Sequence, residues 1–127
     1  MNSNSMSMGG MERRRYKRYR LKNETFAFFG THMGTLVDIS QGGLAVQCAI
    51  VEQDPVFPAQ VDVFVATPTF HHLPDLPFFL VGTTQAAPVS AYDRLMTKRF
   101  SLQFGPLTRN QLARLVHFID GNGVGGN

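Results

Sequence analysis

The sequence predicts an all-β domain, a small six-stranded antiparallel barrel that carries one C-terminal α-helix. Three observations lead to this fold class. Six short segments are rich in β-branched and aromatic residues and are separated by turn-forming residues. One segment near the C-terminus has the periodicity of an amphipathic helix. The 127 residues, of which 43% are hydrophobic, are enough to build one core.

The strand-like segments mostly alternate apolar and polar residues, which places every second side chain on the core side of a strand. In the segment LAVQCAI, for example, Leu44, Val46 and Cys48 share one face. The predicted strands are residues 25–29, 34–39, 44–50, 61–65, 78–81 and 100–104. Between the fourth and fifth, His71 and His72 stand close to two prolines with few other metal ligands nearby. We predict a surface loop there and no metal site.

The predicted helix begins after Thr108, a favourable N-cap residue with Gln111 placed for a reciprocal capping box. Leu107 and Leu112 are spaced as a hydrophobic staple around this start. The apolar stripe of the helix is expected to consist of Leu112, Leu115, Val116 and Ile119. Gly121 is predicted to end the helix.

One folded domain, residues 12–120, is expected between a disordered N-terminal tail, residues 1–11, and a flexible C-terminal tail, residues 121–127. The start of the sequence lacks the apolar segment of a secretory signal, and no run of about 18 apolar residues predicts a membrane span. The single cysteine, Cys48, excludes an internal disulfide and is predicted to be a small core residue. These features fit a cytoplasmic protein.

Basic residues gather in one N-terminal segment. Residues 12–22 contain seven of the twelve basic residues and one of the nine acidic ones, so this segment carries +6 and the rest of the chain −3. A single positive stripe on a mildly acidic body fits a local anion site better than a surface adapted to nucleic acid. Charge repulsion predicts that residues 12–20 form a mobile, extended or hooked segment and not a helix.

Two short motifs about twenty residues apart indicate a binding site. The first, R-x-x-x-R, contains Arg14 and Arg18, and the second, D-x-S-x-x-G, contains Asp38, Ser40 and Gly43. One guanidinium group can donate two parallel hydrogen bonds to phosphate oxygens or to the acceptor edge of guanine, and it can stack on a purine ring. A carboxylate accepts from the amino and imino groups of guanine, and a glycine allows a sharp turn and a close approach. An ordinary turn cap is the alternative for the aspartate and the serine.

The order and spacing of these motifs, followed by the strand patterns and the closing helix, resemble the PilZ family of bacterial cyclic di-GMP receptors. The resemblance covers most of the chain, from about residue 12 to residue 120. It implies a six-stranded barrel and cyclic di-GMP as the ligand, with no cofactor. It assigns ligand contacts to Arg14, Arg18, Asp38, Ser40 and Gly43. Arg13 stands directly before the first motif arginine. With an arginine at this position, the chain resembles the family members that bind an intercalated pair of ligand molecules.

We therefore expect a single-domain cyclic di-GMP receptor or adaptor that changes conformation on binding and signals through an unidentified effector protein. Two alternatives stay open. The basic stripe can serve a nucleic-acid-binding module, although the local charge distribution argues against it, or the scaffold can serve as a ligand-free protein-interaction adaptor, although the presence of both motifs argues against that. No catalytic arrangement, phosphate-binding loop or dinucleotide fingerprint stands out, so no enzymatic activity is expected.

Overall fold

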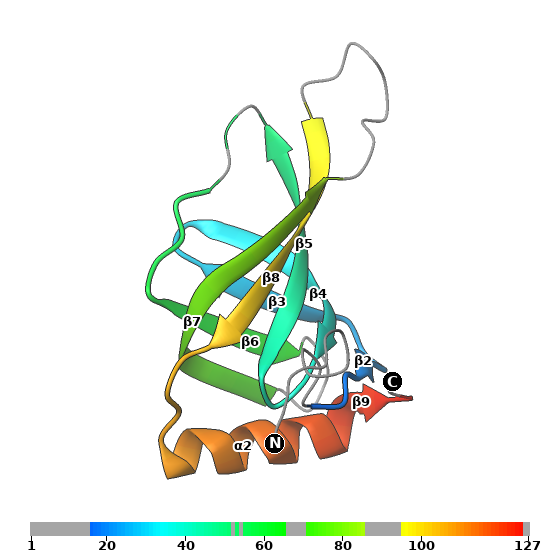
Figure 1. Cartoon of the computed structure of the whole chain (residues 1–127). Helices are drawn as coiled ribbons and strands as arrows, with labels where there is room; N and C mark the ends of the chain where they lie inside the picture. The colour runs from blue at the N-terminus through cyan, green and yellow to red at the C-terminus, as the bar shows by residue number, and fades with distance from the viewer. Residues whose placement is uncertain (1–15, 52, 54, 66–70, 86–94, 126–127) are drawn as a thin grey trace, which may run out of the picture.

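A closed barrel of six antiparallel strands forms most of the molecule (Figure 1). The computed structural model describes residues 16–51, 53, 55–65, 71–85 and 95–125. The barrel strands are β3 (Thr25–Phe29), β4 (His32–Ile39), β5 (Gly43–Val51), β6 (Gln60–Val65), β7 (His71–Gln85) and β8 (Leu95–Phe104). Their order around the barrel is β3-β4-β5-β8-β7-β6, and pairing of β3 with β6 closes it. The predicted fold class is confirmed.

Two further elements lie at one end of the barrel (Figure 1). The helix α2 (Arg109–Asn122) runs across this end, and a separate two-stranded sheet joins β2 (Arg20–Leu21) to β9 (Gly123–Val124). At the opposite end, β5, β7 and β8 extend beyond the other strands. Within the described residues, no helix has the length and apolar character that crossing a membrane requires.

The core follows the predicted alternation. The inward side chains of β5, β6 and β8 are buried, and they include Val46, Val61, Val63 and Phe100. Phe57, from the segment before β6, packs against Phe29 and Phe100 with ring centroids 5.1 and 5.0 Å apart. Side chains of this size fill the interior, as is usual for a small barrel. Cys48 is 4% exposed and belongs to this core, as predicted.

The strand β7 corrects one prediction, because His71 and His72 begin a strand and not a surface loop. A bulge accommodates the proline that made a strand improbable. Val61 pairs with Leu76 and Val63 pairs with Leu73, so two residues of β7 face the single residue Asp62. Pro74 sits in this bulge, where its missing N–H breaks no regular ladder. Asp75, the other bulge residue, adopts φ 58°.

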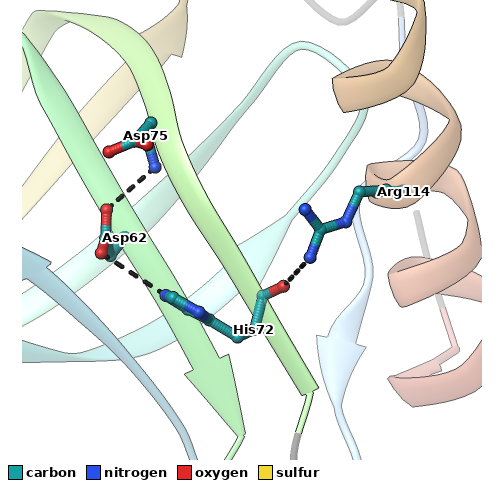
Figure 2. A network of polar contacts seen from close by, with 4 residues as sticks. All are labelled: Asp62, His72, Asp75 and Arg114. Carbon is teal, nitrogen blue, oxygen red and sulfur yellow. Dashed lines mark hydrogen bonds and ion pairs between the residues drawn. The ribbon is translucent and has the colours of Figure 1, made fainter.

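A polar network around the bulge connects the barrel to the helix (Figure 2). The Asp62 carboxylate accepts a hydrogen bond from the Asp75 N–H at 2.9 Å and lies 3.4 Å from His72 Nε2. On the helix side, Arg114 Nη2 donates to the His72 carbonyl at 2.9 Å. Gln111 Nε2 donates to the Asp75 carbonyl at 3.1 Å. The bulge therefore gives α2 polar attachment points in addition to its apolar face.

The helix start was predicted correctly and its end was not, and its buried face was predicted in part, through Leu115 and Ile119. The Thr108–Gln111 capping box is present, with reciprocal hydrogen bonds of 2.9 and 3.0 Å. Gly121 does not end the helix, which continues to Asn122, because Gly121 does not adopt the left-handed conformation that ends many helices. The buried side chains are Leu115, Phe118, Ile119 and Asn122, whereas Leu112 is 41% exposed.

Candidate functional site

The two sequence motifs meet where the chain enters the barrel. The structure describes the first motif from residue 16 to Arg18, and we define residues 16–22, which include this part, as the basic segment. It lies beside the end of β4 and the turn into β5, where the second motif is found. Arg13 and Arg14 lie outside the described residues, so the structure places Arg18 but not its two predicted partners.

Backbone hydrogen bonds set the register between the two motifs. The Tyr19 N–H donates to the Ile39 carbonyl at 2.8 Å, and the Ile39 N–H donates to the Tyr19 carbonyl at 2.9 Å. The basic segment therefore runs antiparallel to the last residues of β4. This register brings Arg18 Nη1 to 3.9 Å from Asp38 Oδ2. The two side chains are 43% and 21% exposed, so the contact is a solvated ion pair that contributes little to stability.

Ser40 organises the turn that joins β4 to β5. Its hydroxyl accepts a hydrogen bond from the Gly42 N–H at 3.1 Å, and its own N–H donates to the Gly43 carbonyl at 2.8 Å. The side chain is only 8% exposed. These contacts are those of a turn cap, the alternative that the sequence left open.

The motif glycine is required for space and not for a left-handed turn. A Cβ atom on Gly43 would lie 2.1 Å from the Leu102 carbonyl oxygen, because β5 and β8 approach closely at this pair. Among the described glycines, positive φ angles occur at Gly30 and Gly125 and not in this turn. The chain does turn sharply between Ile39 and Gly43, but the need for glycine at position 43 comes from the close approach of β8 and not from a positive φ.

Sequence reasoning missed the neighbouring glycine. A Cβ atom on Gly42 would lie 2.8 Å from Cδ2 of the Tyr16 ring, which rests directly on this turn. The adjacent glycine pair Gly42-Gly43 was a visible signal, but nothing in the sequence connected it to a tyrosine 26 positions earlier.

The C-terminal residues hold the basic segment from its other side. Arg20 pairs with Val124 and Leu21 pairs with Gly123, while the Lys22 N–H donates to the Asn122 carbonyl at 2.9 Å. Tyr19 and Arg20 are thus attached to the fold through backbone pairing, although no apolar stripe predicted an anchor. The same pairing places Gly123 and Val124, expected in a flexible tail, in strand β9. The predicted mobility of residues 12–15 falls outside the described residues.

Two other positions are poor candidates for chemistry. A hollow of about 380 Å³ lies between β7 and α2, lined by His71, His72, Leu73, Ala113, Arg114, His117 and Phe118. In the described ranges, no three metal-ligating side chains come together there or elsewhere. Burial raises the pKa of the Cys48 thiol to about 11, so this thiol is protonated and unreactive at neutral pH.

Comparison with solved structures supports the fold. The structure is similar to the PilZ domain of YcgR from Escherichia coli with c-di-GMP, with a TM-score of 0.57 and 16% identity over 86% of this chain and 90% of that chain. It is also similar to YcgR from Escherichia coli in complex with c-di-GMP, with a TM-score of 0.61 and 20% identity. That match covers 86% of this chain and 45% of the longer YcgR chain. At these identities the similarity establishes the fold alone.

Comparison with family models identifies the family. No curated protein sequence matches the chain. The model of the PilZ domain matches residues 12–121, which span both motifs, the barrel strands and most of α2. The chain therefore belongs to the PilZ domain family.

Proposed function

We propose that the chain is a receptor for cyclic di-GMP. One observation carries the proposal: Arg18 of the first motif and Asp38 of the second lie 3.9 Å apart at the barrel end, and both are partly exposed. A guanidinium and a carboxylate at that distance can receive a phosphate and a guanine edge of one compact ligand. Membership of the PilZ family and the c-di-GMP bound to the similar YcgR structures support the same ligand.

Binding then exchanges one ion pair for two ligand contacts. Arg18 leaves Asp38 and forks onto a phosphate or the acceptor edge of guanine, and Asp38 accepts from the N1–H and the amino group of a guanine base. Breaking the Arg18–Asp38 ion pair costs little free energy, because the pair is solvated in the unbound protein. Arg14, with Arg13 before it, would supply the remaining cationic contacts, and Ser40 would hold the turn beneath the base.

Within this proposal the chain acts as a non-enzymatic adaptor. The domain of residues 12–120 would change conformation when Arg13 and Arg14 join Arg18 on the ligand, and an effector protein would read that change. The proposal includes no cofactor, because both motifs act through charge, hydrogen bonding and shape.

Isothermal titration calorimetry with cyclic di-GMP tests the proposal. We expect Arg18→Ala to weaken binding about ten- to a hundred-fold, because it removes a charge-assisted contact of about 1.5–3 kcal/mol. Arg18→Lys should also bind poorly, because an ammonium neither forks nor stacks. Arg109→Ala, which removes an exposed arginine outside both motifs, is the matched control and should bind as the wild type does. A wild-type chain that gives no binding heat would refute the proposal.

The same titrations separate the proposal from nucleic-acid binding. Asp38→Ala should reduce the preference for cyclic di-GMP over cyclic di-AMP, since adenine lacks the donors that the carboxylate reads. Single-stranded oligonucleotides would instead bind through the basic stripe, with affinity that falls steeply with salt and does not depend on Asp38. That second pattern would favour the nucleic-acid alternative.

A further inference from the structure

The basic segment touches the D-x-S-x-x-G motif at two points, and Arg18 lies between them. The first is the paired backbone hydrogen bonds of Tyr19 with Ile39, at 2.8 and 2.9 Å. The second is the ring of Tyr16, which covers Gly42 so closely that a Cβ atom there would lie 2.8 Å from Cδ2 and 3.2 Å from Cε2. Ile39 and Gly42 flank Ser40, so both contacts fall on the same strand end and turn.

The absence of a side chain at Gly42 makes room for the Tyr16 ring. Gly42 does not adopt a positive φ, so its backbone conformation is open to other residues. Besides the tyrosine ring, the nearest atom to the added Cβ is Ser40 Oγ at 3.8 Å, an ordinary contact distance. The close neighbour of Gly42 is therefore the Tyr16 ring, and glycine at this position lets the ring lie directly against the backbone of the turn.

Two anchors three residues apart restrict the backbone between them. A segment of this length spans about 10 Å at most, so fixing Tyr16 and Tyr19 against the turn leaves the backbone of Arg18 little freedom, while its side chain can still turn from Asp38 to a ligand. The Lys17 ammonium also lies 5.8 Å from the centroid of the Tyr19 ring, which adds a cation–π contact within the segment. Tyr16, Tyr19 and Gln41 border a small cavity of about 80 Å³ that residues of α2 line on its other side.

We propose that Tyr16 is a positioning residue for Arg18, and that Gly42 exists to receive its ring. This inference rests on the proposed function, because the affinity for cyclic di-GMP is its main readout. The tyrosine acts by holding the backbone of Arg18, so that the segment is already in the conformation from which the guanidinium reaches the ligand. A segment that is ordered in the unbound protein favours affinity, because association then does not have to include the entropy cost of ordering it.

Calorimetry on four variants tests the anchor. Tyr16→Ala should weaken cyclic di-GMP binding about five- to twenty-fold, and Tyr16→Phe should retain most of the affinity because the ring remains. Gly42→Ala should weaken binding to a similar extent by displacing the ring. The double variant Tyr16→Ala/Gly42→Ala should bind no worse than either single variant, since both changes break the same contact. Phe79→Ala, which truncates an aromatic side chain that is 61% exposed, and Gly82→Ala, whose Cβ has room, are the matched controls.

A second double-mutant cycle, which combines Tyr16→Ala with Arg18→Ala, distinguishes positioning of the arginine from direct stacking of the Tyr16 ring on the ligand. If Tyr16 positions Arg18, then Arg18→Ala costs clearly less affinity in the Tyr16→Ala background than in the wild type. Equal costs in both backgrounds, unchanged binding of Tyr16→Ala, or full additivity of the Tyr16 and Gly42 changes would each overturn the inference. Absence of binding by the wild type would instead refute the proposed function. In that case a nuclear Overhauser contact between the Tyr16 ring and the Gly42 α-protons decides whether the anchor exists, and its absence overturns the inference as well.

Discussion

At the scale of single residues, Gly43 shows how closely the candidate site is built on the barrel itself. Its missing side chain lets β5 approach β8, and the added Cβ of an alanine would lie 2.1 Å from the Leu102 carbonyl oxygen. Backbone atoms cannot move aside as a flexible side chain can. The Gly43→Ala substitution must therefore separate two central strands or expel the turn.

We predict that Gly43→Ala lowers the free energy of unfolding by about 3 kcal/mol, at the upper end of the usual cost of overpacking. Urea denaturation measures this change. Gly82→Ala is the control, because its Cβ would lie 3.7 Å from its nearest neighbour, Ser101 Cβ, and its effect should stay within about 1 kcal/mol. Equal stability of the two variants would contradict the close approach of β5 and β8.

Cys48 gives a prediction on the dependence of stability on pH. Burial raises the pKa of its thiol to about 11, whereas the unfolded chain ionises near 8.5. The unfolded state therefore loses its proton first, so this contribution to stability is complete below about pH 8.5 and is lost as the pH rises through 11. The total loss is about 3 kcal/mol.

Urea denaturation of the wild type and Cys48→Ala between pH 7 and 11 isolates this effect, because the tyrosines and lysines titrate in both proteins. The alanine variant should be less stable at pH 7, owing to the small cavity, and should lose less stability above pH 9. Parallel stability curves for the two proteins would show that the thiol does not ionise differently in the folded state.

At the scale of elements, the N-terminus of α2 depends on its capping box. Thr108 and Gln111 exchange hydrogen bonds, and Gln111 also donates to the Asp75 carbonyl in the β7 bulge. We predict that Thr108→Ala lowers the free energy of unfolding by about 1 kcal/mol and that Thr108→Ser largely preserves it. Thermal denaturation of the three proteins tests this prediction. Equal losses from alanine and serine would mean that the hydroxyl is not the stabilising group.

The elements also show which parts of the fold the sequence can reveal. Strands with one buried face, such as β5 and β6, were predicted because their apolar residues alternate. The first half of β7 was missed because Pro74 and the adjacent histidines are typical of loops, and the bulge that accommodates them depends on Asp62 in another strand. The buried face of α2 includes Phe118 but not Leu112, which depends on how the helix meets the barrel and not on its own periodicity.

In the candidate site, too, some features could be predicted from the sequence and others could not. Arg18 and Asp38 were predicted from two motifs to belong to one ligand site, and the structure brings them within 3.9 Å of each other. The contacts that make this meeting precise, Tyr19 with Ile39 and Tyr16 with Gly42, are backbone pairing and ring packing between distant residues. Neither contact leaves a periodic or charge signal in the sequence, so only the folded chain reveals them.

At the scale of the whole molecule, the charge distribution determines what the barrel can bind. Residues 12–22 carry +6 and the rest of the chain carries −3. Four of the seven cations of this stretch, Lys17, Arg18, Arg20 and Lys22, belong to the described basic segment that β2 and β9 hold against the fold. A ligand that reaches this point meets cationic side chains at close range, while the body of the protein gives a polyanion little further attraction.

We predict that this field binds about two cyclic di-GMP molecules per chain, because each brings two phosphate charges and Arg13, Arg14 and Arg18 can share them. Arg13→Leu removes one guanidinium without touching Arg18 or Asp38, so it should shift the calorimetric stoichiometry toward about one ligand and leave binding measurable. Raising the salt concentration should weaken the second binding event more than the first, because the second relies more on net charge and less on shaped contacts. Lys98→Leu removes a cation outside the basic segment and should leave the stoichiometry unchanged. A wild-type stoichiometry near one, or an Arg13→Leu variant that still binds two ligands, would show that the residue before the first motif arginine does not set how many ligands are bound.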